Sequence, residues 1–215
     1  MAAKVLIVDD HPAAREGLAV RISAQPDLEV CGQAADTAEA LDLVKTARPD
    51  VVVVDIQLQT GNGLDLVQRI KAHDGSIRVL IWSMYPDALY AQRALRVGAL
   101  GYMNKEHPTG RIVDAIRSVR DGKVYLCEDT AEQLLQPAIG GPANSKPSGP
   151  EALSNRELEV FQLIGRALST SQIAERLHRS THTVDAHRQA IKRKLNLKTA
   201  SELNCAAVQW MLENG

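Results

Sequence analysis

Two short apolar runs, residues 51–54 (Val-Val-Val-Val) and residues 79–81 (Val-Leu-Ile), constrain the fold of this chain more than any other feature. Neither run alternates apolar with polar residues, as a strand with one face in water would. Strands of this kind are covered on both faces, which is typical of parallel sheets with helices on each side. The runs therefore predict an α/β fold for the first part of the chain.

Five strand-like runs alternate with five helix-like stretches as far as residue 121. We expect the strands at residues 5–8, 28–33, 51–54, 79–81 and 100–103. We expect the helices at residues 13–24, 37–46, 64–73, 87–97 and 109–121, the last with apolar residues at helical spacing. Parallel strands need such crossover helices, so the pattern predicts a doubly wound, five-stranded parallel sheet.

The composition changes between residues 136 and 150, a stretch rich in Pro, Gly, Ser and Ala that is typical of a linker. Beyond it the pattern is helical. Ser154 with Glu157 forms a capping-box signature, and Ser169 and Ser180 are expected N-caps of two further helices. With a last helix from about residue 199 to 212, the C-terminal part predicts a small four-helix domain.

Composition and charge exclude several classes of protein. The net charge of the 215 residues is −1, so the chain as a whole is not a polybasic binder. Its three cysteines, Cys31, Cys127 and Cys205, are far apart and form no CxxC pair, which indicates reduced thiols, no zinc site and no disulfide framework. The N-terminal apolar run is too short and acidic for a signal peptide, and no run is long enough to cross a membrane. We expect a soluble, cytoplasmic protein.

Acidic residues follow the first and third strands, and they would converge at one edge if these two strands are neighbours. Asp9 and Asp10 end the first strand, and Asp55 ends the third. Taken singly, each is best interpreted as a solvated loop residue, but three carboxylates at one sheet edge would repel each other and would suit a hard cation such as Mg²⁺. Ser83 and Lys105 follow the fourth and fifth strands at the same edge. A hydroxyl and a cation beside a carboxylate–metal cluster suit an added phosphoryl group.

These positions, with "LIVDDHPAAREGL" and "GALGYMNK", resemble the receiver domain of bacterial two-component response regulators over roughly residues 4–122. The resemblance implies a flavodoxin-like fold in which a histidine kinase phosphorylates Asp55. It also implies that Asp9, Asp10, Asp55 and the backbone carbonyl of Gln57 bind Mg²⁺. Lys105 and Ser83 would contact the phosphoryl group, and Tyr102 would be the aromatic residue of the switch.

The loop after Asp55 departs from the family pattern. Leu58, Gln59 and Thr60 stand where the family usually has Met-Pro-Gly or a similar sequence. Without the proline the loop is less fixed in φ. Because residues near the acceptor govern the access of water in this family, Gln57 and Gln59 bear on the lifetime of the phosphate.

The segment from residue 153 to 197 resembles a LuxR-type helix-turn-helix, as found in response regulators of the NarL/FixJ class, and the resemblance covers about residues 151–213. "IAERL" would be the scaffold helix and "TVDAHRQAIKRKL" the recognition helix. Val184, His187, Ile191 and Leu195 recur at helical steps and are expected in the core. The family often has Gly where Ala167 stands and Glu where Gln172 stands.

The recognition helix is strongly basic, although the C-terminal domain is only mildly so. Early positions on a recognition helix reach base edges, while flanking basic and hydroxyl groups hold phosphates. We expect Asp185, Ala186 and Gln189 to contact bases. The expected phosphate contacts are Thr181, Thr183, Arg188, Lys192, Arg193 and Lys194. The alternatives are a merely solvated basic helix and, for His187, a metal ligand rather than a packed histidine.

The interpretation is a receiver domain (1–122), a linker (123–150) and a helix-turn-helix domain (151–215). Such a protein is a DNA-binding transcription regulator and not an enzyme, although a receiver can dephosphorylate itself. Its expected partners are double-stranded DNA, a sensor histidine kinase and a second copy of the chain, with Val208, Trp210 and Leu212 as candidates for the dimer contact. One alternative is a phosphate-ester hydrolase, which usually has a second Asp where Gln57 stands. The other is a DNA-binding regulator whose receiver no longer takes phosphate.

Overall fold

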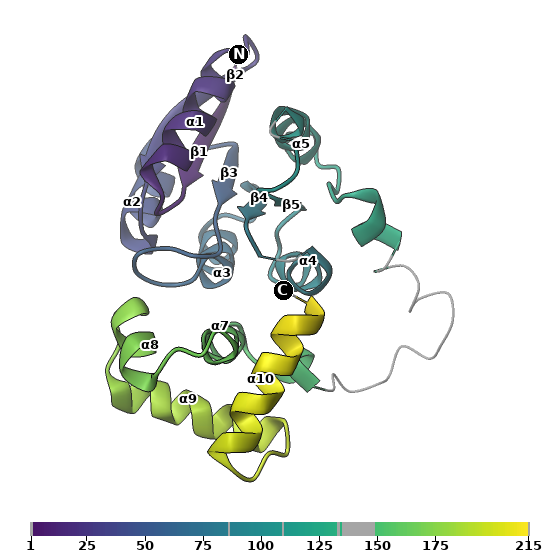
Figure 1. The fold of residues 1–215 in the computed structure, drawn as a ribbon. Helices are drawn as coiled ribbons and strands as arrows, with labels where there is room; N and C mark the ends of the chain where they lie inside the picture. The colour runs from purple at the N-terminus through teal and green to yellow at the C-terminus, as the bar shows by residue number, and fades with distance from the viewer. Residues whose placement is uncertain (1, 86, 109, 133, 135–148, 215) are drawn as a thin grey trace. The chain divides into compact units, whose positions relative to one another are not determined.

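The computed structural model describes all residues except 1, 86, 109, 133, 135–148 and 215. The chain divides into two compact units, Met1–Gly140 and Gly141–Gly215. Figure 1 labels the helices and strands of both units.

The first unit is a five-stranded parallel sheet with helices between consecutive strands. The strand order is β2-β1-β3-β4-β5, which is the flavodoxin-like order that the resemblance to a receiver domain implies. The strands are β1 (Ala3–Val8), β2 (Leu28–Ala34), β3 (Val51–Val54), β4 (Arg78–Ser83) and β5 (Gly101–Asn104). The helices are α1 (Pro12–Ser23), α2 (Thr37–Ala47), α3 (Gly63–His73), α4 (Asp87–Arg96) and α5 (Arg111–Arg120). The predicted α/β fold is therefore confirmed, and strands one and three are neighbours.

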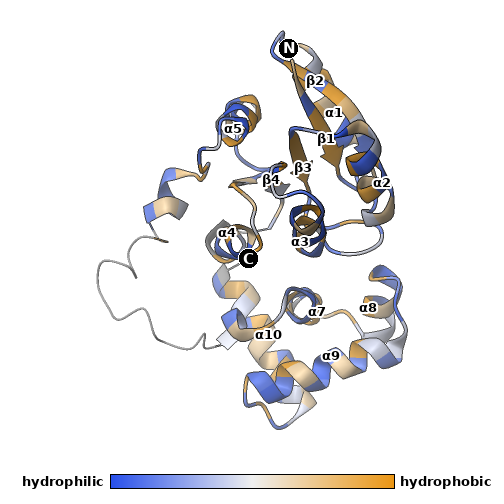
Figure 2. Cartoon of the chain, turned by 180° about the vertical axis from the view of Figure 1, so that it is seen from behind, coloured by the Kyte–Doolittle hydropathy of each residue, from blue (hydrophilic) through white to orange (hydrophobic). Residues whose placement is uncertain are grey.

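The valine run forms the centre of the sheet. Val52 pairs with Leu6 of β1 on one side and with Val79 of β4 on the other. All four valines are buried, because the sheet has helices on both faces. Val51 and Val53 pack in one core cluster together with residues of α1 and α5, which cover that face. The central strand β3 is correspondingly hydrophobic in Figure 2, whereas the helices around the sheet carry many hydrophilic residues.

Side-chain caps fix the starts of two helices that lie next to the sheet edge. Asp36 accepts hydrogen bonds from the backbone of Ala38 and Glu39 at the start of α2, and Asn62 accepts one from Leu64 at the start of α3. After α5, Tyr125 forms a parallel bridge with Gly101 of β5. The chain therefore still packs on the first unit three residues beyond the predicted domain end at residue 122.

The second unit contains a short 3₁₀ helix (Gly149–Ala152) and the helices α7 (Asn155–Gly165), α8 (Thr170–Arg176), α9 (Thr181–Lys194) and α10 (Ala200–Asn214). The predicted caps are confirmed. Ser154 with Glu157 and Ser169 with Gln172 form capping boxes, and Ser180 caps α9. Helices α7 and α10 approach closely at Gly165, where an added Cβ would lie 2.4 Å from Met211.

The ends of α7, α8 and α9 share one geometry. At each end the backbone makes the paired hydrogen bonds of a Schellman motif, and the residue after the C-cap adopts positive φ. Glycine is the usual residue there, but this chain places Ala167, His178 and Asn196 at φ values of 61°, 49° and 56°. The alanine that departs from the family pattern therefore occupies a left-handed position, which disfavours any residue with a Cβ.

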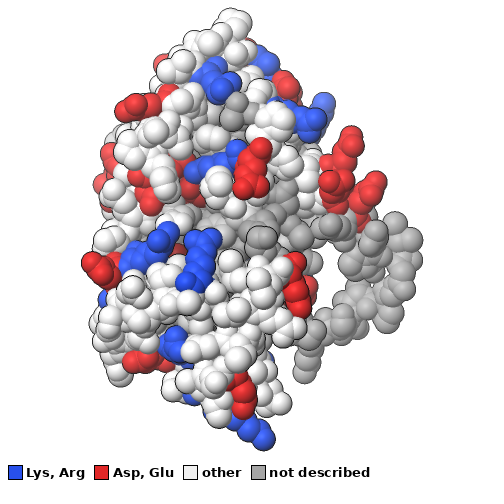
Figure 3. Space-filling view, in the orientation of Figure 1, with Lys and Arg blue, Asp and Glu red and all other residues white. Residues whose placement is uncertain are grey.

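Acidic and basic side chains are interspersed over the visible face of both units (Figure 3), in keeping with the net charge of −1. Attraction of a polyanion therefore depends on local groups rather than on the whole chain. Over the part of the chain that the structure describes, no helix combines the length and apolar character needed to span a membrane.

Candidate functional site

The carboxyl ends of β1 and β3 bring Asp9 and Asp55 together. Val8 pairs with Val54 in the sheet, so the residues that follow them leave the sheet side by side. The backbone N–H of Asp55 donates to Val8 O at 2.8 Å. Gly63 packs directly on the backbone here, because an added Cβ would lie 2.0 Å from Asp55 O. The glycine at the start of α3 is therefore required for the acid to occupy this position.

Asp55 is buried, and each of its carboxylate oxygens has a partner from another strand end. Ser83 Oγ donates to Oδ1 at 2.6 Å. Lys105 Nζ lies 2.5 Å from Oδ2 and also 2.6 Å from Asp9 Oδ2, so one ammonium group bridges the two acids. Four residues that are up to 96 positions apart in the sequence thus meet at one edge, as predicted. The Lys105 ammonium also lies 5.1 Å from the centre of the Trp82 ring.

Asp10 completes a set of side-chain ligand atoms that fits a metal ion. Ligand atoms of Asp9, Asp10, His11 and Asp55 all lie within 4.8 Å of one another. Asp10 Oδ1 is buried and accepts no hydrogen bond within the described residues, although His11 Nδ1 lies 2.7 Å away. A buried carboxylate oxygen without a donor is costly unless a cation compensates it. Hard carboxylate oxygens are the ligands that Mg²⁺ prefers, so these residues fit the predicted ion.

The pKa values of Asp55 and Lys105 are both raised, but for different reasons. Burial raises the pKa of Asp55, and neighbouring Asp9 adds to this, whereas Lys105 and Ser83 oppose it. For Lys105 burial acts to lower the pKa, but the carboxylates of Asp55 and Asp9 outweigh it and raise the pKa. The site therefore holds a basic carboxylate against a firmly charged ammonium group.

The predicted switch residues lie on the neighbouring strands. Tyr102 is buried in β5, and its hydroxyl donates to the backbone carbonyl of Tyr85 at 2.7 Å. The same carbonyl accepts a hydrogen bond from Asn104 Nδ2 at 3.1 Å. Tyr85 lies two residues after Ser83, so Tyr102 and Asn104 both hold the segment that follows the Ser83 hydroxyl. Tyr102 is identified from the sequence, but Asn104 is not. The only sign of Asn104 in the sequence is its place at the end of β5.

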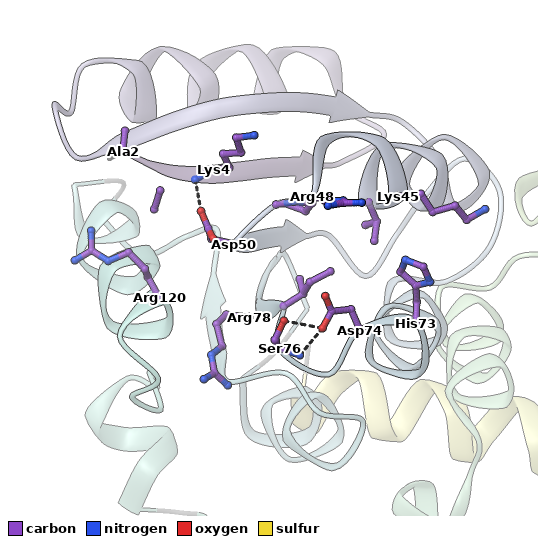
Figure 4. Close-up of a pocket in the computed structure, with 14 residues that line it drawn as sticks. Ala2, Lys4, Lys45, Arg48, Asp50, His73, Asp74, Ser76, Arg78 and Arg120 are labelled. Carbon is purple, nitrogen blue, oxygen red and sulfur yellow. Dashed lines mark hydrogen bonds between the residues drawn. The ribbon is translucent and has the colours of Figure 1, made fainter.

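A hollow of about 940 Å³ lies at the opposite edge of the sheet, near the starts of β1 and β4 (Figure 4). Its lining includes Lys45, Arg48 and His73, which lie at the C-terminal ends of α2 and α3. The positive side chains of Lys45 and Arg48 complement the partial negative charge at the C-terminus of α2. The acids of the hollow are held locally, for example Asp74, which accepts hydrogen bonds from Ser76. We therefore attribute these charges to the helix ends.

Helix α9 presents the residues that were predicted to contact DNA. Asp185, Ala186 and Gln189 are exposed, as are Thr181, Arg193 and Lys194, while Thr183, Arg188 and Lys192 are partly exposed. Val184 and Ile191 are fully buried against the other helices, which confirms this part of the predicted core stripe. The helix therefore has one face in the core and a polar face in solvent.

Three polar residues of α9 also contact the rest of the unit. Lys194 Nζ lies 2.6 Å from Glu157 Oε2, and the ion pair joins α9 to α7. Arg188 donates to Asn204 of α10 at 3.2 Å, and Thr183 Oγ1 lies 2.9 Å from Ser180 Oγ at the cap. His187 is half-buried, and burial lowers its pKa. It belongs to no group of possible metal ligands in the described part of the chain, which favours the packed histidine over the ligand.

Comparison with known proteins gives the family of each unit. Residues 5–117 match the family described as "Response regulator receiver domain", and residues 151–207 match "Bacterial regulatory proteins, luxR family". The chain is a response regulator of the LuxR family. The matched ranges contain the carboxylate cluster and helix α9, so the predicted NarL/FixJ type of domain pair is confirmed.

Similar proteins cover from about two thirds of the chain to nearly all of it. The regulator is similar to the oxygen regulatory protein NreC of Staphylococcus carnosus, with 36% identity over 93% of this chain and 94% of that protein. A LuxR-family two-component response regulator from Aurantimonas is 32% identical in its crystal structure, with a TM-score of 0.61 over 65% of this chain and 99% of that one. RcsB from Salmonella enterica, solved with promoter DNA and the phosphomimetic BeF₃⁻, shares the fold at 20% identity, with a TM-score of 0.65 over 97% of this chain and 99% of that one.

Proposed function

We propose that a histidine kinase phosphorylates this regulator on Asp55 and that the phosphoryl group controls its binding to DNA. The observation that carries the proposal is the arrangement of partners around Asp55. Lys105 and Ser83 each contact one of its oxygens, and the buried Oδ1 of Asp10, which has His11 Nδ1 2.7 Å away but makes no hydrogen bond within the described residues, lies in the same cluster. An ion pair with Lys105 alone would also suit a structural acid, but a second and third carboxylate gathered at the same point favours a phosphoacceptor with a metal site.

The transfer step uses groups that this site provides. A carboxylate oxygen of Asp55 attacks the phosphorus of a phosphohistidine, the P–O bond forms and the P–N bond breaks, and the imidazole leaves with the electron pair and takes up a proton. Lys105 and Ser83 would then contact the phosphoryl oxygens. Mg²⁺ held by Asp9, Asp10, Asp55 and the backbone carbonyl of Gln57 would neutralise part of the added negative charge.

The signal is proposed to pass from Ser83 to the segment that Tyr102 and Asn104 hold at the Tyr85 carbonyl. The output is DNA binding by α9, with Asp185, Ala186 and Gln189 at the bases. Thr181, Thr183, Arg188, Lys192, Arg193 and Lys194 are the proposed phosphate contacts. Dimers would form on activation, and the exposed Val208 and Leu212 of α10 suit such a contact. The proposal includes a receiver domain at residues 1–122, a linker at residues 123–150 and a DNA-binding domain at residues 151–215. It also includes a cytoplasmic location.

Intact-mass measurement after incubation with a small-molecule phosphodonor and Mg²⁺ tests the proposal. Wild-type protein is expected to gain one phosphoryl group, and Asp55→Asn none. Phosphorylated protein is then expected to bind duplex DNA more tightly than the unphosphorylated form. A folded wild-type protein that takes phosphate neither from the donor nor from a kinase would favour the regulator whose receiver works without phosphate.

A further inference from the structure

The loop of residues 57–62, which follows Asp55, lacks the proline that fixes it in related receivers, and the structure shows what holds its two ends. Gln57 and Asn62 form an antiparallel bridge across the base of the loop. Next to the bridge, the N–H of Gly63 donates to Ile56 O at 2.8 Å. These contacts close the base but do not reach the tip, where Gln59 and Thr60 are exposed.

The tip of the loop is held from α2. Thr37 Oγ1 donates to the backbone carbonyl of Thr60 at 2.9 Å, across 23 residues of sequence. Thr37 is buried, and the neighbouring Gly61 packs against its hydroxyl so closely that an added Cβ would lie 2.3 Å from Oγ1. Gly61 also has a φ of 96°, which glycine adopts readily. Within the described residues, no side chain from another helix or strand makes a further hydrogen bond to residues 57–61.

Thr37 itself sits at a rigid point of the fold. It is the first residue of α2, and the preceding Asp36 caps the helix through hydrogen bonds of 2.8 and 3.0 Å from Ala38 and Glu39. Glu39 Oε2 in turn accepts a hydrogen bond from Ala35 N at 2.9 Å, which fixes the chain that enters the helix. A hydroxyl held in this way positions whatever it contacts, as an outer-layer residue does for a metal ligand.

We propose that Thr37 is a positioning residue that takes the place of the missing proline and sets the metal affinity and phosphate lifetime of the site. It acts through the loop, because the same loop carries the Gln57 carbonyl and the Gln59 side chain. The inference rests on the proposed function, since it concerns the Mg²⁺ and phosphate at Asp55. Helix α2 contributes no residue to the carboxylate cluster. Through Thr37 it nevertheless contacts the loop that borders the cluster.

The test compares Thr37→Val, which removes the hydroxyl at nearly constant size, with Thr37→Ser, which keeps it. Thr46→Val is the matched control, because Thr46 Oγ1 also donates to a backbone carbonyl, that of Asp42 at 2.9 Å, but at the far end of α2. Mg²⁺ alone is titrated calorimetrically into each full-length protein. We expect about fivefold weaker binding for Thr37→Val, the equivalent of one net hydrogen bond, and wild-type binding for Thr37→Ser and Thr46→Val. The phosphoryl group on Asp55 should also be lost faster in Thr37→Val.

Amide hydrogen exchange of residues 57–63 in the same proteins separates the role of Thr37 in holding the loop from the proposed Mg²⁺ site. Faster exchange in Thr37→Val, restored in Thr37→Ser, is expected whether or not Mg²⁺ binds, and it reports the loop contact alone. Wild-type Mg²⁺ affinity and wild-type exchange in a folded Thr37→Val protein would overturn the role of Thr37. If the wild-type protein bound no Mg²⁺ while the exchange effect persisted, the proposed metal site would fall, and Thr37 would remain as the anchor of the loop.

Discussion

Lys105 Nζ lies 2.5 Å from Asp55 Oδ2, and both side chains are more than 90% removed from solvent. Asp9 shares the same ammonium group, so two buried carboxylates depend on one cation. Breaking a buried ion pair from one side leaves an uncompensated charge, which is far more costly than losing a surface pair. The same cluster that suits phosphoryl transfer therefore also determines the stability of the first unit.

Lys105→Met should lower the free energy of unfolding at pH 7 by about 3 kcal/mol, because it leaves Asp9 and Asp55 buried without their cation. Urea unfolding without metal measures the loss. The loss should shrink as the pH falls, since removing Lys105 raises the pKa of Asp55 further and protonation then relieves the repulsion. Lys123→Met, at an exposed lysine after α5, is the control and should change the stability little. Equal losses in the two variants would contradict the prediction.

Asp55→Asn should stabilise the metal-free protein at pH 7, by about 1 kcal/mol, because it removes one of two buried carboxylates while Lys105 keeps Asp9 as its partner. The same substitution should abolish phosphorylation. The folded-state pKa of Asp55 is raised, chiefly by burial, so this carboxyl favours the folded state at low pH and loses that contribution as the pH rises through its folded pKa. Asparagine does not ionise, so the variant does not lose this stability as the pH rises. The advantage of Asp55→Asn in urea unfolding should therefore be largest near neutral pH and vanish toward about pH 4, the ordinary range of Asp.

A wild-type protein more stable than Asp55→Asn at neutral pH would show that the Lys105 ion pair outweighs the cost of burial. Added Mg²⁺ provides a second check on the same proteins. It should stabilise wild type by mass action and Asp55→Asn less, since the variant has lost one of the proposed ligands.

Much of the carboxylate cluster was predictable because parallel strands end at one edge. Once Val51–Val54 is interpreted as a buried strand beside β1, Asp9 and Asp55 must be neighbours, and residues that end β4 and β5 must face the same side. Thr37 and Asn104 were not predictable in this way. Their partners are backbone carbonyls in loops, and the position of a loop carbonyl follows from local turns rather than from the apolar pattern.

The ion pairs that long side chains of α9 form within the second unit could not be predicted from the sequence. Lys194 belongs to a basic run and Glu157 to a capping box, and the sequence gives no sign that they form an ion pair across 37 residues. The pairing depends on the crossing of α7 and α9, which apolar spacing alone does not define. Ala167 differs from Lys194, because the sequence alone marks it as a departure from the family pattern. The structure places it at a left-handed backbone position.

Ala167→Gly should stabilise the second unit by about 1 kcal/mol. Ala167 holds a φ of 61° after α7, where a Cβ is disfavoured and glycine is not. Because its side chain is exposed, the substitution removes little packing. Urea unfolding followed by the fluorescence of Trp210, in a Trp82→Phe background, reports this unit, since Trp210 lies 6.0 Å from Phe161 of α7.

Ala186→Gly is the matched control for this prediction. Ala186 is also exposed but lies inside α9, where glycine costs about 1 kcal/mol relative to alanine. The two substitutions should therefore act in opposite directions. A loss of stability in both variants would mean that the left-handed turn after α7 is not maintained in solution.

Gln189 and Arg193 should affect DNA binding in different ways, although both are exposed on α9. Gln189→Ala should cost about 1–3 kcal/mol of discrimination between a site selected from random duplexes and a scrambled duplex, because a base contact carries sequence information. Arg193→Ala should weaken binding to both duplexes equally and reduce the slope of log affinity against log salt by about 0.9, as expected when one phosphate contact is lost.

Lys194→Ala tests whether a basic residue with an intramolecular partner contributes in the same way as Arg193. Lys194 already pairs with Glu157, whose pKa is lowered because this ammonium and the Ser154 cap outweigh the effect of burial. Engaging a phosphate would require Lys194 to share or leave that carboxylate, so its removal should change the salt slope less than Arg193→Ala and lower the stability of the second unit more. Affinity measurements across a salt series, with urea unfolding of the same proteins, decide the matter. Equal slope changes for the two variants would show that Lys194 leaves Glu157 when DNA binds.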